Sequence, residues 1–258
     1  MPMKLVSMKK IIALVSLCIT WINPPLYSES PDEYKTRLAY EALSEVDQRQ
    51  INAIRECGVS RVRRCLRGLI TNLEKEKDYE MLIRRESVIS LGNMRMTEAL
   101  APLRVLYAKE KDISVKSMIV RALGQIAHKD DLKFVTSLLG DPEVQIRKQA
   151  ARALFIWSDK STIAEIQAKI GTEKEDVVKV ELLATAYSHD QTKLEYIDQL
   201  VKLLQSKDRL TRARAGEVLG ELKVKEALVD LEHAAEAEND AYVRPIIRRA
   251  YLETLYFQ

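Results

Sequence analysis

The stretch VKSMIVRALGQIAHKDDLKFVTSLLGDPEVQIRKQAARAL, residues 115–154, decides the fold of this chain. It contains a phrase in which a residue that is usually aliphatic precedes a basic residue. A run of small and apolar residues follows and ends, eight positions later, in Leu-Gly or a related pair. The phrase returns every 31 to 33 residues, with its basic residue at Arg84, Lys116, Arg147, Lys179, Arg212 and Arg244. A fixed period of this length predicts a stack of two-helix units that bury their apolar faces against one another.

The residues between two copies of the phrase also have helical spacing. Ile163, Ile166 and Ile170 lie three and four positions apart, which places them on one face of a helix. No stretch after residue 30 alternates apolar and polar residues as a half-buried strand would. We therefore predict an all-α fold: an αα-superhelix of about five to six two-helix units over residues 79–252.

Residues 115–154 resemble HEAT-like repeats, especially the short type found in phycobilin lyases, and EALAPLRVLY, residues 98–107, is similar to the second helix of that repeat. The resemblance extends over about residues 79–252. It is strong for units one, two, three and five and weaker for the fourth, where Tyr187 occupies the position of the glycine; the third unit has Phe155 at that position. It implies a solenoid whose second helices line a concave side, and it also raises the alternative of a lyase-like protein that handles a small ligand.

The expected function is that of a scaffold which binds another protein through this concave side. The candidate binding residues lie between the core positions of the second helices, and they mix both signs of charge with two aromatic side chains. They are Arg104, Tyr107, Lys133, Glu165, Lys169, Tyr196, Lys202, Asp230 and His233. Tyr107 and Tyr196 are the expected anchors, because tyrosine combines a large contact area with a polar tip. An alternative for Tyr107 is packing between units.

The recurring basic residue allows two interpretations. It forms a ladder for anionic ligands, or it pairs with acidic or carbonyl groups of the neighbouring unit. Recurrence in every unit favours pairing, because a stacking contact must repeat and a ligand contact need not. The cluster of Arg61, Arg63, Arg64 and Arg67 is likewise a solvated face beside acidic neighbours or, alternatively, a contact for an anion.

The N-terminus has the pattern of a secretory signal peptide. Three lysines precede an apolar run of 12 residues, 11–22, which is too short to cross a bilayer. We expect cleavage after Ser28, so that residues 1–28 are removed and the protein is exported to the periplasm or cell envelope. An alternative is that Cys18 lies in a lipoprotein processing box and carries a lipid, which would make the protein a membrane-tethered structural component of the envelope.

Residues 29–78 precede the clear repeats and are expected to form a helical pair that caps the stack, as solenoids require. Cys57 and Cys65 flank the expected turn of this pair. In an exported protein two such cysteines favour a disulfide, with two buried reduced thiols as the alternative. Residues 253–258 resemble the recognition sequence of a viral protease used to remove purification tags, and we exclude them from functional argument.

The charge of the chain argues against nucleic-acid binding, and its motif content argues against catalysis. The three lysines of residues 1–28 account for the formal net charge of +3, so the remainder is neutral and has no general attraction for nucleic acid. His128, His189 and His233 lie in different units, and none belongs to a metal-ligand motif or to the His-Glu pairs of HEAT-repeat hydroxylases. We therefore predict no enzyme activity, no metal and no cofactor.

Overall fold

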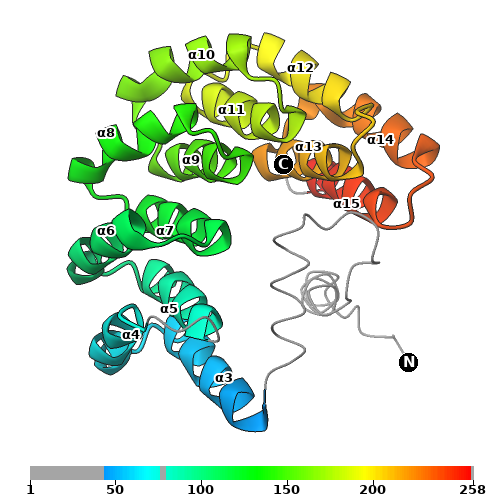
Figure 1. The fold of residues 1–258 in the computed structure, drawn as a ribbon. Helices are drawn as coiled ribbons and strands as arrows, with labels where there is room; N and C mark the ends of the chain where they lie inside the picture. Colours follow the sequence, from blue (N-terminus) through cyan, green and yellow to red (C-terminus); the bar gives the residue numbers. More distant parts are fainter. Residues whose placement is uncertain (1–43, 76–79, 257–258) are drawn as a thin grey trace, which may run out of the picture.

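The computed structural model describes residues 44–75 and 80–256. Within these ranges the chain forms 13 α-helices, α3 to α15, with short 3-10 turns and no strand. Figure 1 shows the helices as a curved stack that follows an arc from α3 to α15. The prediction of an all-α superhelix is confirmed.

The helices form two rows (Figure 1). The row on the inside of the arc consists of α3 (Glu45–Val59), α5 (Met81–Met94), α7 (Ile113–Ile126), α9 (Val144–Trp157), α11 (Asp176–His189), α13 (Arg209–Leu222) and α15 (Val243–Tyr256). The row on the outside consists of α4 (Leu66–Asn72), α6 (Leu100–Lys109), α8 (Lys129–Ser137), α10 (Ile163–Thr172), α12 (Glu195–Leu203) and α14 (Leu228–Ala237). Each inner helix contains one copy of the recurring phrase, except α3, which has only its glycine, Gly58.

Local chemistry fixes where the inner helices begin and end. The carboxylate of Asp112 accepts a hydrogen bond from the amide of Val115 at 3.0 Å, and that of Asp208 accepts from Thr211 at 2.8 Å. These N-caps satisfy amides that the first helical turn leaves free. Four inner helices end in a left-handed residue, three positions after the end of the phrase: Arg95, Ala127, Ser158 and Lys223.

The glycine of the phrase sets the spacing of the inner row. A Cβ on Gly124 would lie 2.4 Å from the Cβ of Ala153, and a Cβ on Gly92 would lie 2.8 Å from the Cα of Ala122. Side chains larger than hydrogen would hold these helices apart. Consecutive inner helices therefore pack closely against one another, whereas consecutive outer helices make few direct contacts. A closely spaced inner row and a widely spaced outer row produce the curvature of the stack.

This arrangement corrects one prediction. The second helices of the units, which we expected to line the concave side, form the outer, convex row (Figure 1). The physical reason is that the glycines lie on the first helices, so the first helices approach one another most closely and face the inside of the curve. All nine predicted binding residues, from Arg104 to His233, belong to the outer row.

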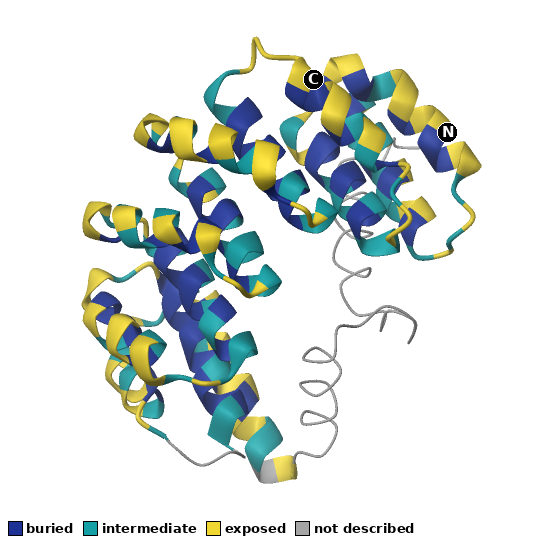
Figure 2. Cartoon of the chain, turned by 45° about the horizontal axis from the view of Figure 1, so that its top comes forward, coloured by how far each residue is buried: buried dark blue, intermediate teal, exposed yellow. Residues whose placement is uncertain are grey.

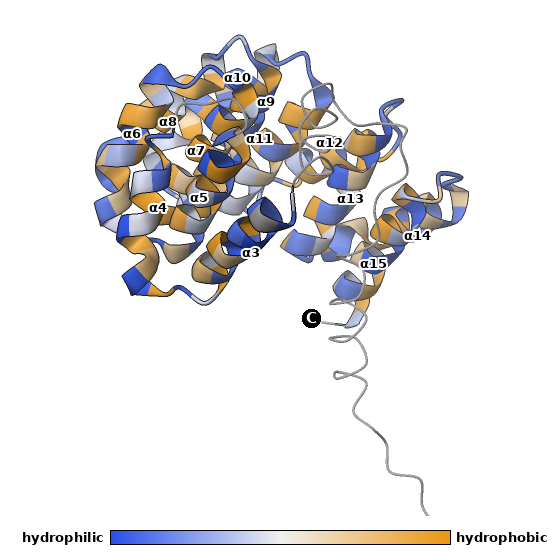
Figure 3. Ribbon diagram, turned by 60° about the horizontal axis from the view of Figure 1, so that its bottom comes forward, coloured by the Kyte–Doolittle hydropathy of each residue, from blue (hydrophilic) through white to orange (hydrophobic). Residues whose placement is uncertain are grey.

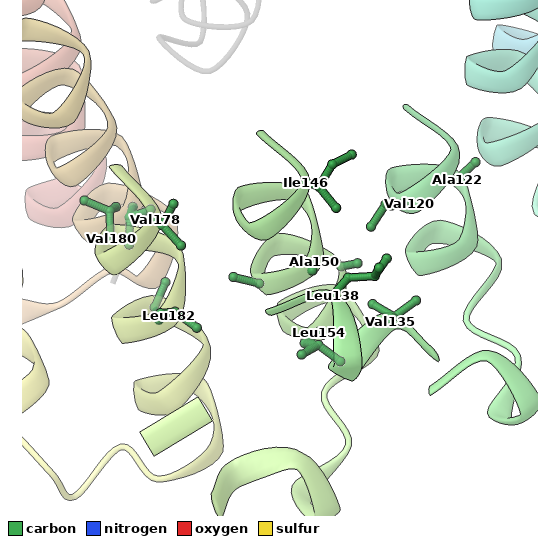
Figure 4. Close-up of a cluster of buried hydrophobic side chains, with 14 of the residues drawn as sticks. Val120, Ala122, Val135, Leu138, Ile146, Ala150, Leu154, Val178, Val180 and Leu182 are labelled. Atoms are coloured by element: carbon green, nitrogen blue, oxygen red, sulfur yellow. The ribbon is translucent and has the colours of Figure 1, made fainter. Parts of the chain in front are cut away.

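The core lies between the two rows. Figure 2 shows buried residues along the middle of the stack and many exposed residues on the outer helices, and in Figure 3 the loops are mainly hydrophilic. Figure 4 shows how one part of the core is built from three successive units. Val120 of α7, Ile146 and Leu154 of α9, and Leu182 of α11 are each at most 1% exposed. At roughly 1.5–3 kcal/mol for each large aliphatic side chain, this continuous core stabilises units that would not fold alone.

The N-terminal pair consists of α3 and α4, and a disulfide joins its two parts. Cys57 lies near the end of α3, Cys65 lies in the 3-10 turn before α4, and their Cα atoms are 6.1 Å apart. A Cβ on Gly58 would lie 2.7 Å from the Cα of Ser90, so α3 approaches α5 as the other inner helices approach one another.

Several predictions concern residues outside the described ranges. The predicted signal peptide over residues 1–28, the predicted lipidation site Cys18 and the last two residues of the chain all lie there. Among the helices of the described ranges, none has the length and apolar character needed to cross a membrane.

Candidate functional site

Three of the recurring basic residues connect the two helices of their unit. Arg84, Arg147 and Arg212 each donate from Nε to a glutamate 26 positions later, at the end of the outer helix of the same unit. These glutamates are Glu110, Glu173 and Glu238, and the distances are 3.0, 2.9 and 2.7 Å. Each arginine also donates to backbone carbonyl groups of the segment that precedes its helix. The arginines thus serve packing, as the argument from recurrence favoured, but their acidic partners belong to the same unit and not, as predicted, to the neighbouring one.

Each of these glutamates also organises the loop that follows it. One carboxylate oxygen of Glu173 accepts hydrogen bonds from the amides of Lys174 and Glu175, at 3.0 and 3.1 Å. Burial alone would raise the pKa of Glu173, but the hydrogen bonds from Arg147 and these amides lower it. The sequence signal, which we did not use, is a glutamate two positions before an acidic residue at 110–112, 173–175 and 238–240.

The units with a lysine in the recurring position lack this glutamate. The ammonium group of Lys116 lies 4.9 Å from the centre of the Tyr107 ring. That of Lys179 lies 3.8 Å from a carboxylate oxygen of Asp176, one turn earlier in α11. A lysine cannot make the forked contact to a carboxylate and to carbonyl groups at the same time, so the basic residue and its partner change together.

Three of the predicted binding residues contribute to packing between units. Arg104 of α6 forms a two-pronged ion pair with the buried Asp131 of α8, at 2.6 and 2.9 Å. Tyr107 is partly buried, and its ring meets the ring of Phe134 edge to face, with the two centres 5.2 Å apart. Tyr196, expected to be an exposed anchor, is only 6% exposed and accepts a hydrogen bond from Gln167. For Tyr196 the prediction of an exposed anchor is wrong.

The other predicted residues are spread over the convex face and do not form one site. Lys133, Glu165 and His233 are exposed on three different outer helices, and Lys169 is partly buried on α10. Lys202 and Asp230 do come together. They line a shallow groove between α12 and α14, which we call the α12/α14 groove, with Leu194, Ile197, Asp198, Val201 and Glu226.

The inner row presents a different surface, which the sequence analysis did not consider. In α5 only Met81, Arg85, Ile89 and Asn93 are partly exposed, and they lie four positions apart. The rest of α5 is buried against its neighbours, so this stripe faces the inside of the arc. The corresponding stripes are Ser114, Met118, Arg121 and Gln125 in α7, and Gln145, Gln149, Arg152 and Ile156 in α9.

Three arginines lie close together on these stripes. Burial lowers the pKa of Arg121, and the positive charges of Arg152 and Arg85 lower it further. Arg85 has a counter-charge, because it forms an ion pair with Glu86 at 3.0 Å. Over residues 44–75 and 80–256, neither Arg121 nor Arg152 has an acidic or hydrogen-bonding partner in the structure. We call Arg85, Arg121 and Arg152 the inner arginine cluster.

A small pocket adds positive charge near the inner arginine cluster. It has a volume of about 170 Å³ and lies where α3, α5 and α7 end, with Arg61 and Arg95 in its wall. Asn93 and Gln125 also line it, and the Gln125 amide donates to the Asn93 side-chain oxygen at 3.1 Å. Because Asn93 and Gln125 belong to the stripes, the pocket continues the inner surface.

The C-terminal part of the inner row has balanced charges instead. Arg214 of α13 donates to Glu181 of α11 at 2.7 Å and to Glu217 and Glu221 of its own helix. Burial lowers the pKa of Arg214, but these carboxylates raise it above its ordinary value. The charge of Arg214 is therefore compensated by carboxylates, in contrast to the charges of Arg121 and Arg152.

The metal-binding side chains lie apart in the part of the chain that the structure describes. No group of three or more metal-binding side chains occurs there. His128 accepts a hydrogen bond from the amide of Asp130 at the start of α8, and His233 is exposed. His189 lies at the end of α11 with both ring nitrogens buried and without a hydrogen-bond partner among the described residues.

The comparisons with known proteins agree with this architecture. A family model of HEAT repeats matches residues 66–155 and 106–191. No curated protein matches the sequence. One similar structure is the complex of CpcE and CpcF of phycocyanin lyase from Nostoc sp. PCC7120, with a TM-score of 0.57, 20% identity, and coverage of 91% of this chain and 97% of that chain. Human deoxyhypusine hydroxylase in complex with glycerol has a TM-score of 0.43, 17% identity, and coverage of 98% and 92%. Residues 66–191 thus match a family model of HEAT repeats, within an αα-superhelix that continues on both sides of them.

Proposed function

We propose that this chain is a scaffold that binds an acidic segment of another protein on the inner surface of α5, α7 and α9. The observation that carries the proposal is the pair Arg121 and Arg152, which lie near one another without a counter-charge among the described residues. The recurring arginines of the same helices, Arg84 and Arg147, pair fully with glutamates. A fold that neutralises its packing arginines so regularly has no packing reason to leave two others unpaired.

The composition of the inner surface supports a protein ligand. The stripes combine arginine with methionine and isoleucine, namely Met118, Ile89 and Ile156, and Ile156 is 40% exposed. Arginine, methionine and large apolar residues are typical of the centres of protein interfaces. A carboxylate of the partner would make charge-assisted, forked hydrogen bonds with Arg121 and would relieve its repulsion with Arg152.

The similar structure supports the same class of function. CpcE is found in a complex with CpcF, so a solenoid of this shape is compatible with a protein partner. At 20% identity the likeness concerns the fold, and the identity of the partner of this chain is a separate question.

The test compares two double variants as bait in a crosslinking pull-down from the organism that encodes the chain. Arg121→Gln with Arg152→Gln removes two charges from the inner surface, and Lys109→Gln with Lys133→Gln removes two from the outer helices. We expect one dominant partner, and its affinity should fall by at least about tenfold in the inner variant only. This difference between the two variants should become smaller at high salt, because salt screens the charges. Equal capture by the inner variant, with its helical content unchanged, would contradict the proposal.

We also propose that the protein is exported and that its partner lies in the periplasm or cell envelope. The support is the pattern of residues 1–28, and for a lipid anchor the position of Cys18. N-terminal sequencing of the protein from cell fractions tests both. A chain that begins at Glu29 supports cleavage after Ser28, whereas fatty-acid labelling that disappears in Cys18→Ala supports the tethered alternative.

We propose further that the chain binds its partner without catalysing a reaction. The lyase-like alternative draws its support from the resemblance to phycobilin lyases and from the likeness to the CpcE–CpcF complex. Titration with a bilin and with haem separates the two. We expect no change in the absorption spectrum of either pigment, and a saturable spectral shift would favour ligand handling.

A further inference from the structure

The α12/α14 groove is the larger of two surface depressions that stand out in the described residues, with a volume of about 350 Å³. It lies on the convex side, between the outer helices of two successive units, and so is separate from the inner arginine cluster. Its floor is apolar. Ile197 is almost fully buried, Val201 is partly buried, and Leu194 is 42% exposed.

The rim of the groove is acidic. Asp198 of α12, Glu226 in the turn before α14, and Asp230 of α14 are all exposed, and Lys202 is the single basic residue of the lining. None of the three carboxylates forms an ion pair with another described residue. The positive charge of one lysine leaves the rim with a net negative charge.

An irregular unit explains why the groove lies at this place. Tyr187 of α11 occupies the position that glycine has in α5, α7 and α13, and its side chain is 7% exposed. The tyrosine holds α11 and α13 apart, and these helices contact one another over less of their length than α5 and α7 do. Burial raises the pKa of Tyr187, and the negative charge of Glu226 raises it further.

We infer that the α12/α14 groove is a docking site for a short amphipathic segment of a partner protein that carries lysine or arginine beside aliphatic residues. The apolar floor fits aliphatic side chains spaced along one face of a helix or strand. The three unpaired carboxylates fit basic side chains on either side of them, since complementary charges fix the orientation of a ligand and reject the opposite sign. Membrane surfaces with anionic lipids are disfavoured by the same charges.

The experiment is selection from a library of random 12-residue peptides displayed on phage, with the purified chain as the target. We expect enrichment of peptides that combine aliphatic residues with lysine or arginine. The affinity of the enriched peptides, made synthetically, is then measured for Leu194→Asp and for the triple variant Asp198→Asn, Glu226→Gln, Asp230→Asn. The matched control is Val105→Asp, which places the same charge on the exposed outer face of α6.

The outcomes are distinct. We expect Leu194→Asp and the triple variant each to weaken binding by about tenfold or more, with the wild-type affinity falling as salt is added, and Val105→Asp to have no effect. Equal binding of the basic peptides by all variants, or no enrichment of basic amphipathic peptides, would overturn the inference, whereas any acidic peptides would report on the inner surface instead. Because Arg121 and Arg152 are unchanged in these variants, this result is independent of the proposed inner surface.

Discussion

Replacing Gly124 with alanine tests whether close helix contact determines the inner row. The new Cβ would lie 2.4 Å from the Cβ of Ala153 and 2.7 Å from its Cα. Ordinary carbon contacts are about 3.5–4.0 Å, so α7 and α9 must move apart by about 1 Å. Overpacking of this kind costs up to about 3 kcal/mol, and the higher helix propensity of alanine offsets about 1 kcal/mol. We expect a net loss of about 2 kcal/mol.

The same substitution at Gly68 is the matched control. Gly68 lies within α4, where an added Cβ meets no atom within 4 Å. Gly68→Ala should stabilise the protein by about 0.5–1 kcal/mol through helix propensity alone. The free energies of unfolding of the two variants should therefore differ by about 3 kcal/mol, measured by urea denaturation followed by circular dichroism. The slopes of the transitions are compared as well, because repeat arrays do not always unfold in one step. A midpoint that rises as much in Gly124→Ala as in Gly68→Ala would refute the reasoning.

Three further predictions concern stability. Replacing both Cys57 and Cys65 with serine should cost about 2–3 kcal/mol, measured by urea denaturation beside the oxidised wild type, because the bridge closes a short loop. Glu173→Gln should cost about 3 kcal/mol, since it leaves a partly buried arginine without its carboxylate, whereas the exposed Glu165→Gln should stay within about 0.5 kcal/mol. Burial lowers the pKa of His189 in the folded state. As the pH falls below about 6.5, the imidazole therefore takes up a proton in the unfolded state before it does so in the folded state, and the wild type should lose stability. A His189→Leu variant that loses as much stability between about pH 7 and pH 5 would exclude this cause.

The fold follows from the sequence because the contact between units must repeat. A basic residue recurs with the period of the units, and in alternate units the structure shows Arg84, Arg147 and Arg212 making the same contacts. Their partners escaped notice because the glutamates lie in a different helix, 26 positions away, and two units lack them.

The candidate site was predicted poorly, for a physical reason. Helical periodicity identifies residues that share a face, but it does not reveal which row lies inside the curve. The glycines at 92, 124 and 220 contain that information, since the row with the smallest residues is the row that packs most closely. Applied to the sequence, this rule would have directed attention to the first helices and to Arg121 and Arg152. Tyr196 accepts a hydrogen bond from Gln167 of the previous unit, a contact that no local pattern encodes.

The glycine contacts also determine how the molecule responds to force. Where the recurring phrase has its glycine, consecutive inner helices touch through backbone and Cβ atoms, so these parts of the inner edge have an almost fixed length. The outer helices are connected mainly to their own partners and touch one another little. Pulling on the two ends should therefore change the curvature of the stack. The distances between outer helices change, whereas the distances between inner helices stay nearly constant. A partner held on the inner edge would remain bound while the curvature of the whole stack changes.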